Sequence, residues 1–374
     1  MKTLVERILI VFASGVVTLL GIEVAVAIVS PQQLILLRGD IWRPDDLFGY
    51  RHRENADTEV NTGEGTVRFI TDDQGFRVTE VGRADRVQAE HAILLIGDSF
   101  VAGLQVENEE TIGGRVEAGL GEKGFSVRVD NAGVNGWTPN HYLLEARRSL
   151  RLRAYDLGIV CLYVGNDVVD REESSFPPRD KAARNTFEIP PSLEWIEFVH
   201  AILLPINDIL ETRSHLFILI KERLRPTLLP MVLAKSYHPP VFNVRETGSR
   251  RWALTAGICK RIADEFAERS VPVIFVLIPT IYQVREDLWP DHLALFNIDP
   301  STVKLSQPNV LLGGAFETEG LTLLDPLDVM RREAESGNRH YGSIDPHLNR
   351  RGNRSVAEFI LPSVEAALSG RFQP

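Results

Sequence analysis

The chain has 374 residues, of which 44% are hydrophobic and 25% charged, as expected for an ordinary globular protein with a sizeable core. Its formal net charge of -10 and the absence of a basic stripe argue against a nucleic-acid partner. Cys161 lies in an apolar run, which predicts a buried free thiol, and Cys259 lies in a helical pattern. Two such cysteines give neither a disulfide framework nor a metal-binding spacing.

Residues 1–30 are predicted to form a transmembrane anchor or a signal peptide. Lys2 and Arg7 precede an apolar stretch over 8–29, which is long enough to span a bilayer and contains Glu23 near its far end. Ala25-Val26-Ala27 fits a signal-cleavage pattern, but the apolar run continues past it, which favours an uncleaved anchor. The positive charge before the helix places the N-terminus in the cytoplasm. In either case the bulk of the chain is exported, to the periplasmic or extracellular side.

Residues 31–91 are interpreted as a linker and a small β-hairpin that lead into the main domain. An alternating run over 66–71 is typical of a strand, and Asp72-Asp73-Gln74-Gly75 then predicts a turn.

From residue 92 onward, apolar runs alternate with helical patterns, and residues 92–374 are interpreted as one domain. The predicted strands are 92–96, 126–130, 157–164, 272–278 and 321–324, and the predicted helices are 111–122, 139–150, 250–269 and 352–368. Strands that alternate with helices indicate a parallel sheet with right-handed crossovers.

An insertion over 171–249 interrupts this alternation and is longer than an ordinary connection. Its first part is charged and rich in proline, and its second part, 195–233, is apolar at helical spacing. The plain interpretation is a pair of helices packed on the sheet. A lid over the site and a face that lies on the membrane are the alternatives.

Gly97-Asp98-Ser99 directly follows the first apolar strand. In open α/β sheets ligands bind beyond the carboxyl ends of the strands, so this turn would present the Ser99 hydroxyl where chemistry takes place. The alternative is that Ser99 only caps the following helix.

Two further loops follow strands at the same edge. In the loop over 131–138, Gly133 and Gly136 permit a backbone path that leaves an N–H directed at a ligand, although an ordinary glycine-rich turn is the alternative. In Gly165-Asn166-Asp167, the Asn166 amide can donate a hydrogen bond into the site, or it forms an Asx-turn or cap.

Asp345 and His347 stand just before the last predicted helix. A carboxylate two residues from an imidazole can fix its tautomer and orientation and so make it a general base. Together with His340 they could also be imagined as metal ligands, but a metal site needs three or four ligands at fitting spacing.

Taken together, the four segments resemble the blocks of the SGNH (GDSL-type) hydrolase family, in the same order along the chain. Gly97-Asp98-Ser99 is similar to the first block, residues 131–138 to the second, Gly165-Asn166-Asp167 to the third, and Asp345 with His347 to the last. The resemblance covers roughly residues 90–370, and Gly75-Phe76-Arg77 before it is similar to a stretch in membrane-anchored members.

This resemblance implies a flavodoxin-like three-layer α/β/α fold with a five-stranded parallel sheet, and a serine esterase that needs no metal or organic cofactor. It implies Ser99 as nucleophile, His347 as base and Asp345 as the acid that orients it. The oxyanion hole would consist of the backbone N–H groups of Ser99 and Gly136 and the side-chain amide of Asn166.

The implied substrate is an ester, an O-acetyl group of a cell-envelope or external glycan. One alternative is an O-acetyltransferase that modifies an exported polysaccharide with an integral-membrane partner, and another is a non-catalytic binding module. Phe100 stands where the family commonly has Leu, and the spacing from Asp345 to His347 is one residue shorter than in the best-known secreted members. That spacing is similar to the exported branch that includes polysaccharide O-acetylation proteins.

Overall fold

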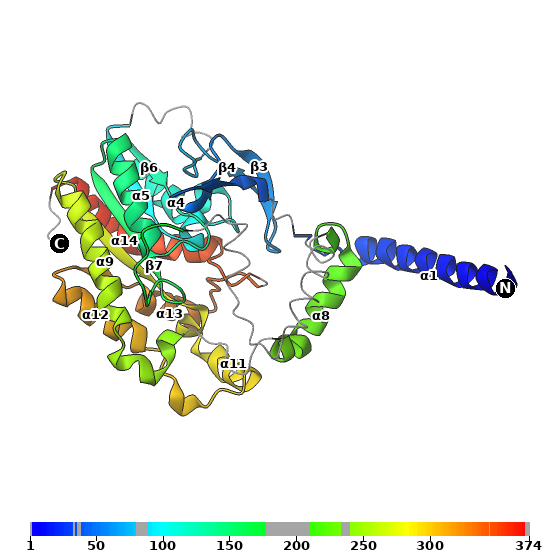
Figure 1. Cartoon of the computed structure of the whole chain (residues 1–374). Coiled ribbons are helices and arrows are strands. Elements are labelled where there is room, and N and C mark those ends of the chain that lie inside the picture. Colours follow the sequence, from blue (N-terminus) through cyan, green and yellow to red (C-terminus); the bar gives the residue numbers. More distant parts are fainter. Residues whose placement is uncertain are drawn as a thin grey trace.

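The computed structural model describes residues 2–32, 34–35, 39–79, 89–176, 209–232, 240–343 and 345–370 (Figure 1). At its centre lies a five-stranded parallel sheet with the order β6-β5-β7-β8-β9. The strands are β5 (His91–Ile96), β6 (Val127–Asn131), β7 (Leu157–Tyr163), β8 (Val273–Ile278) and β9 (Leu323–Leu324). The first strand of the sheet therefore lies between the second and the third, which is the flavodoxin-like order. The predicted fold class is confirmed.

Helices cover both faces of the sheet (Figure 1). Side chains of β5 alternate between two apolar cores, with Leu94 and Ile96 in one and Ile93 and Leu95 in the other. The first core packs against α5 (Pro139–Leu152), α9 (Arg251–Ala267) and α12 (Gln307–Thr318). The second packs against α4 (Ile112–Glu122), α13 (Leu327–Glu335) and α14 (Arg350–Leu368). Burial on both faces explains why β5, β7 and β8 are nearly continuous apolar runs.

The four helices predicted to alternate with the strands are present, and the described part of the domain contains further helices that were not predicted, among them the short α3 (Ser99–Ala102) and four later ones. The latter are α10 (Ile281–Val284), α11 (Trp289–Leu295), α12 and α13. In α12, Pro308 and the pair Gly313-Gly314 weaken the helical pattern, and packing on the sheet outweighs that low propensity. Short 3₁₀ helices lie at Gly39–Ile41, Asn108–Glu110, Pro240–Phe242, Val244–Gly248, Glu286–Leu288 and Pro300–Thr302.

The lead-in contains two β-hairpins where the sequence suggested one. β1 (Trp42–Asp45) pairs with β2 (Gly49–His52), and β3 (Asp57–Asn61) pairs with β4 (Thr66–Ile70). The first pair was not predicted, because Pro44 and the charged residues around it hide the strand pattern. Phe48 and Phe69 of the hairpins are buried in the same core as Trp137. The lead-in thus packs on the α5 side of the sheet.

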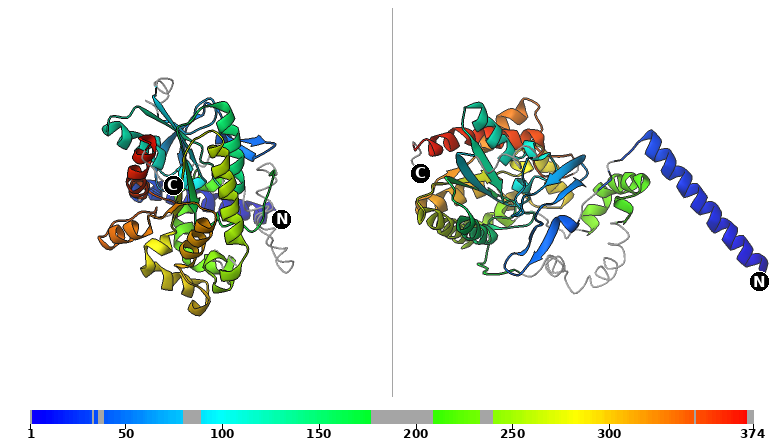
Figure 2. Two further views of the ribbon diagram at one scale, coloured as in Figure 1. Left: turned by 90° about the vertical axis from the view of Figure 1, so that its left-hand side faces the viewer. Right: turned by 90° about the horizontal axis from the view of Figure 1, so that it is seen from above.

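Helix α1 (Lys2–Val29) projects away from the rest of the chain (Figures 1 and 2). Its segment Leu4–Val29 has a mean hydropathy of 2.3 and is not buried, so its length and composition suit a membrane anchor or a signal sequence. Helix α8 (His215–Val232) contacts it. Of the apolar helical stripe predicted over 195–233, residues 195–208 and 233 lie outside the described residues, and the later part contains α8 and a short helical turn at 209–211.

Cys161 and Cys259 are both buried and free. The prediction of a buried free thiol at Cys161 is confirmed.

Candidate active site

Ser99 is the first residue of the short helix α3 (Ser99–Ala102), which follows β5 directly. The cap of this helix is Asp98, whose carboxylate accepts a hydrogen bond from the Phe100 N–H at 2.9 Å. The cap interpretation of Ser99 is therefore wrong, and the Ser99 hydroxyl is left for another role. A Cβ on Gly97 would lie 2.3 Å from Val101 Cγ2, so the tight turn that presents Ser99 requires glycine there.

The loop before α14 brings His347 and Asp345 to Ser99. The Nε2 atom of His347 lies 2.7 Å from the Ser99 Oγ, and its Nδ1 is hydrogen-bonded to a carboxylate oxygen of Asp345. The three side chains thus form one hydrogen-bonded chain, although Ser99 and His347 are 248 positions apart. With the Nδ1 proton held by Asp345, the Nε2 atom is the acceptor for the serine proton.

Neighbouring residues fix the carboxylate and the imidazole in place. Gln105 donates a hydrogen bond from Nε2 to the second oxygen of Asp345 at 2.9 Å. The Phe100 ring packs against the His347 ring with centroids 4.8 Å apart. Phe100, the departure from the family pattern, therefore supports the imidazole on one side.

The electrostatics of the pair suit a general base. Burial favours the neutral form of His347, but the hydrogen bond and charge of Asp345, together with the charge of Asp98, raise the pKa of His347 above its ordinary value. Burial would raise the pKa of Asp345, yet its hydrogen bonds with His347 and Gln105 lower that pKa overall. Asp345 is accordingly ionised, and its charge favours the protonated form of the His347 imidazole.

Asn166 and Gly136 come to the same place from the loops after β7 and β6. Asn166 donates one amide N–H to the buried Asp98 carboxylate at 3.0 Å, which ties its loop to the turn that carries Ser99. Because a primary amide has two N–H groups, the hydrogen bond to Asp98 uses only one of the two donors of Asn166. Gly136 has a φ of +77°, a conformation that favours glycine.

The second loop also packs directly against α3. Asn131 donates to the Val101 carbonyl at 2.9 Å, and a Cβ on Gly133 would lie 2.5 Å from the Ala102 nitrogen. Within the described residues, the backbone N–H groups of Ser99 and Gly136 form no hydrogen bond. These two donors are therefore available to a ligand.

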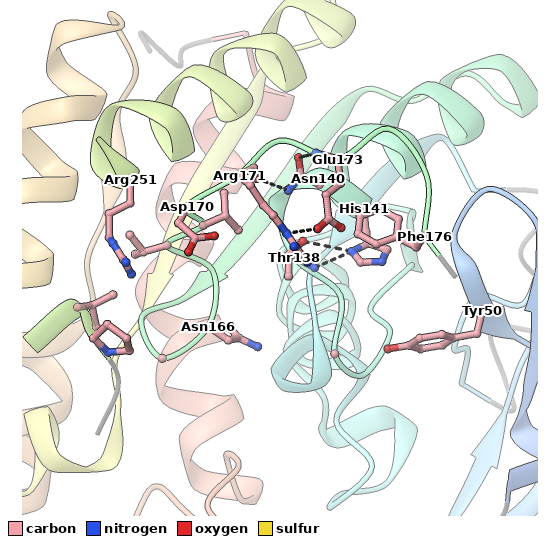
Figure 3. Close-up of a pocket in the computed structure, with 16 residues that line it drawn as sticks. Tyr50, Thr138, Asn140, His141, Asn166, Asp170, Arg171, Glu173, Phe176 and Arg251 are labelled. Atoms are coloured by element: carbon pink, nitrogen blue, oxygen red, sulfur yellow. Dashed lines mark hydrogen bonds and ion pairs between the residues drawn. The ribbon is translucent and has the colours of Figure 1, made fainter. Parts of the chain in front are cut away.

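A cavity of about 520 Å³ adjoins the loops of Gly136 and Asn166 (Figure 3). Figure 3 shows Asn166 on one side and Tyr50 on the other, each with its polar end directed inward. The wall is mixed polar and aromatic, and it includes Thr138, Asn140, His141, Asp170, Arg171, Glu173, Phe176 and Arg251. Such a wall suits a polar ligand that also has apolar faces.

The other histidines near the site have separate partners. His340 is hydrogen-bonded through Nε2 to Glu333 at 2.8 Å, so it does not join Asp345 and His347 in one set of ligands. His141 is stacked between the rings of Trp137 and Phe176, and burial lowers its pKa to about 3. His141 therefore acts in packing.

Sequence reasoning missed three residues that contact the site: Gln105, Tyr50 and Glu64. Gln105 bonds Asp345, Tyr50 bonds the Asn135 carbonyl, and Glu64 bonds the Asp345 N–H. Each contact joins positions that are 85 or more residues apart, and none of these residues lies in a recognisable motif. Only the three-dimensional structure reveals them.

No family model and no curated protein matches this sequence. Among solved structures, TesA is 12% identical and covers 74% of this chain and 99% of its own, with a TM-score of 0.39. The acetyl xylan esterase AlAXEase is 14% identical over 73% of this chain and 99% of its own, with a TM-score of 0.40. A lipolytic G-D-S-L family member from Veillonella parvula DSM 2008 is 12% identical over 73% and 97%, with a TM-score of 0.36. Likenesses this distant add nothing to the argument from topology and side-chain geometry.

Proposed function

We propose that this protein is a serine ester hydrolase of the SGNH type. The observation that supports it most is the hydrogen-bonded chain from the Ser99 Oγ through His347 to Asp345, at the carboxyl ends of parallel strands. A serine hydroxyl is a weak nucleophile unless an adjacent base removes its proton, and His347 is at hydrogen-bond distance to do so.

The reaction follows from this geometry. His347 takes the hydroxyl proton as the Ser99 Oγ attacks the ester carbonyl, and Asp345 stabilises the resulting imidazolium. The developing oxyanion accepts hydrogen bonds from the N–H groups of Ser99 and Gly136 and from the Asn166 amide. His347 then returns the proton to the leaving alcohol. Water, activated by the same imidazole, attacks the acyl-enzyme and releases the acid and free Ser99.

The substrates we propose are O-acetyl groups on cell-envelope or external glycans. The cavity beside the oxyanion loops supports this, because hydroxyl-rich sugars bind to polar side chains and their apolar faces pack on aromatic rings such as Phe176. The test is acetate release from an acetylated polysaccharide, compared with Ser99→Ala. Hydrolysis by the parent alone supports the proposal. Acyl-enzyme that persists until an acceptor sugar is added would instead indicate an acetyltransferase.

We also propose that α1 stays attached as a membrane anchor, with the remainder of the chain on the exported side. Glu23 of α1 accepts hydrogen bonds from the Ser214 hydroxyl at 2.6 Å and from the His215 and Leu216 N–H groups at 2.7 and 3.1 Å. A carboxylate at a helix N-terminus is stabilising, so Glu23 joins α1 to α8. Cleavage after Ala27 would remove this contact.

The mass of the chain extracted from membranes tests the anchor. The proposal predicts that Glu23 and the residues before it are retained. A mature chain that begins at residue 28 would contradict it, and the exported part would then be released from the membrane.

A further inference from the structure

The two N-terminal hairpins reach the candidate site from outside the sheet, at two separate points. Tyr50 lies on β2, and Glu64 lies in the turn between β3 and β4. Neither residue belongs to the motifs that resemble the hydrolase family. Tyr50 contacts the backbone of the loop that contains Gly136, and Glu64 contacts the backbone of the loop that contains Asp345.

Tyr50 holds the peptide group that contains the Gly136 N–H. Its hydroxyl donates a hydrogen bond to the Asn135 carbonyl at 2.8 Å. In a trans peptide the carbonyl and the following N–H point in opposite directions, so this bond directs the Gly136 N–H away from Tyr50. The Trp137 indole N–H adds a second tie, to the Tyr50 carbonyl at 3.2 Å.

The approach of Tyr50 also accounts for the glycine at position 136. A Cβ there would lie 2.7 Å from the Tyr50 hydroxyl, closer than a real Cβ contact. The positive φ of Gly136 and the proximity of Tyr50 therefore both favour glycine, which has no Cβ, at position 136. The side chain of residue 50 and the conformation of residue 136 form one packed unit.

Glu64 holds the loop that supplies Asp345. One oxygen of its carboxylate accepts the Asp345 backbone N–H at 2.9 Å, and the other accepts the Ser343 hydroxyl at 3.3 Å. With its backbone fixed, Asp345 can direct one carboxylate oxygen to His347 and the other to Gln105. Glu64 thus acts on the imidazole through Asp345.

We propose that Tyr50 and Glu64 are positioning residues of the reaction, so that the N-terminal hairpins form part of the active site. This inference rests on the proposed ester hydrolysis. Tyr50 would set the direction of an oxyanion donor, and Glu64 would set the orientation of the acid. Small displacements of groups that act in the transition state cost large factors in rate.

The first test is Tyr50→Phe, which keeps the ring and removes the hydroxyl. Because an oxyanion donor acts in the transition state, kcat should fall about 10- to 100-fold while KM stays near that of the parent. The matched control is Tyr155→Phe, which removes a hydroxyl bonded to the buried Asp130 at 2.8 Å and leaves the site untouched. Equal kcat values for the parent and Tyr50→Phe would overturn the role of Tyr50. An equal fall in both variants would do the same.

The second test compares Glu64→Ala with Glu64→Gln. The amide oxygen of Gln can still accept the Asp345 N–H, so Glu64→Gln should retain most of the activity. Glu64→Ala should lower kcat and shift the acid limb of the pH profile of kcat/KM to lower pH, because a misoriented Asp345 raises the pKa of His347 less. Glu59→Ala, on the exposed face of the same hairpin, is the control. An unmoved limb in Glu64→Ala would overturn the role of Glu64.

Reaction of the parent with a fluorophosphonate distinguishes a failure of the proposed ester hydrolysis from a failure of the positioning roles of Tyr50 and Glu64. If the parent is labelled and the variants keep the parental kcat, the positioning roles fail and ester hydrolysis stands. If the folded parent is neither labelled nor active on esters, the proposed function fails and the positioning roles fail with it.

Discussion

At the residue scale, Asp345 determines both the orientation and the basicity of His347. In the proposed reaction His347 must be neutral to accept the serine proton, so kcat/KM should fall as the pH drops through the pKa of His347. That pKa is raised above its ordinary value of 6.5, so the acid limb is expected above pH 6.5. In Asp345→Asn, the hydrogen bond and charge of Asp345 are lost and only the charge of Asp98 still opposes burial, so the pKa of His347 should fall relative to the parent.

A pH profile of kcat/KM for the two proteins is the measurement. The midpoint of the acid limb should move to lower pH in Asp345→Asn, and kcat should fall by about 10⁴, as expected when the imidazole loses the partner that fixes its tautomer. An acid limb at the same pH in both proteins would show that Asp345 does not control the base.

Asn166 is the side-chain donor that we propose for the oxyanion hole. Asn166→Ala should lower kcat by about 10² to 10³ with little change in KM, since the amide acts on charge that develops in the transition state. The variant also loses the hydrogen bond to Asp98, so the unfolding midpoint should be measured beside the kinetics. A parental kcat in folded Asn166→Ala would remove Asn166 from the oxyanion hole.

At the element scale, Arg77 ties the lead-in to the segment that follows Ser99. Its buried guanidinium donates to the carbonyls of Ala102 and Val106, both at 2.6 Å, and also to Gly103 and Asn108. Burial lowers the pKa of Arg77 to about 9, and the charges of Glu107 and Glu109 oppose that shift. One side chain thus satisfies acceptors of several buried residues.

Replacing Arg77 by Met should therefore leave these acceptors unsatisfied and lower the free energy of unfolding by about 3–5 kcal/mol. The control is Arg68→Met on β4, which breaks an ion pair with Asp57 that is 43% exposed on both sides and should cost less than about 1 kcal/mol. Chemical denaturation measures both variants. If both variants lose less than about 1 kcal/mol of unfolding free energy, the proposed contribution of the Arg77 hydrogen bonds to stability would be contradicted.

The elements that were predicted correctly have strong local patterns. The strand over 92–96 is a continuous apolar run, and the helix over 352–368 has a clear apolar face, so both were visible in the sequence. The strand at Trp42–Asp45 was not, because a short hairpin with proline and charged residues gains its stability from packing against the domain. Helix α12 was missed for a similar reason, since burial of Leu312 and Phe316 outweighs its glycines.

The site shows the same division. Ser99, Asn166, Asp345 and His347 stand in short motifs at strand and helix ends, where the sequence indicates chemistry. Tyr50, Glu64 and Gln105 act through contacts with loops distant in the chain, and a single sequence contains no signal for such contacts. The motif residues that the structure brings together were therefore predictable, and the residues that contact their loops were not.

At the scale of the whole molecule, three groups of elements converge on one edge of the sheet. Ser99 and Asn166 follow parallel strands, and the loop before α14 carries Asp345 and His347. The N-terminal hairpins contact the backbone of the loop after β6, at Asn135, and the backbone of Asp345. The lead-in also follows α1 in the chain, so the segment that leaves the proposed anchor is the one that completes the site. Folding of the hairpins onto the domain would therefore be required for full activity.

The most direct test of an activated Ser99 is intact-mass analysis of the full chain in detergent after reaction with a fluorophosphonate. The parent and the exposed-serine control Ser126→Ala should each gain one adduct, and Ser99→Ala should gain none. The absence of an adduct on the folded parent, or an adduct that persists on Ser99→Ala, would contradict the proposal that Ser99, His347 and Asp345 form a nucleophilic triad.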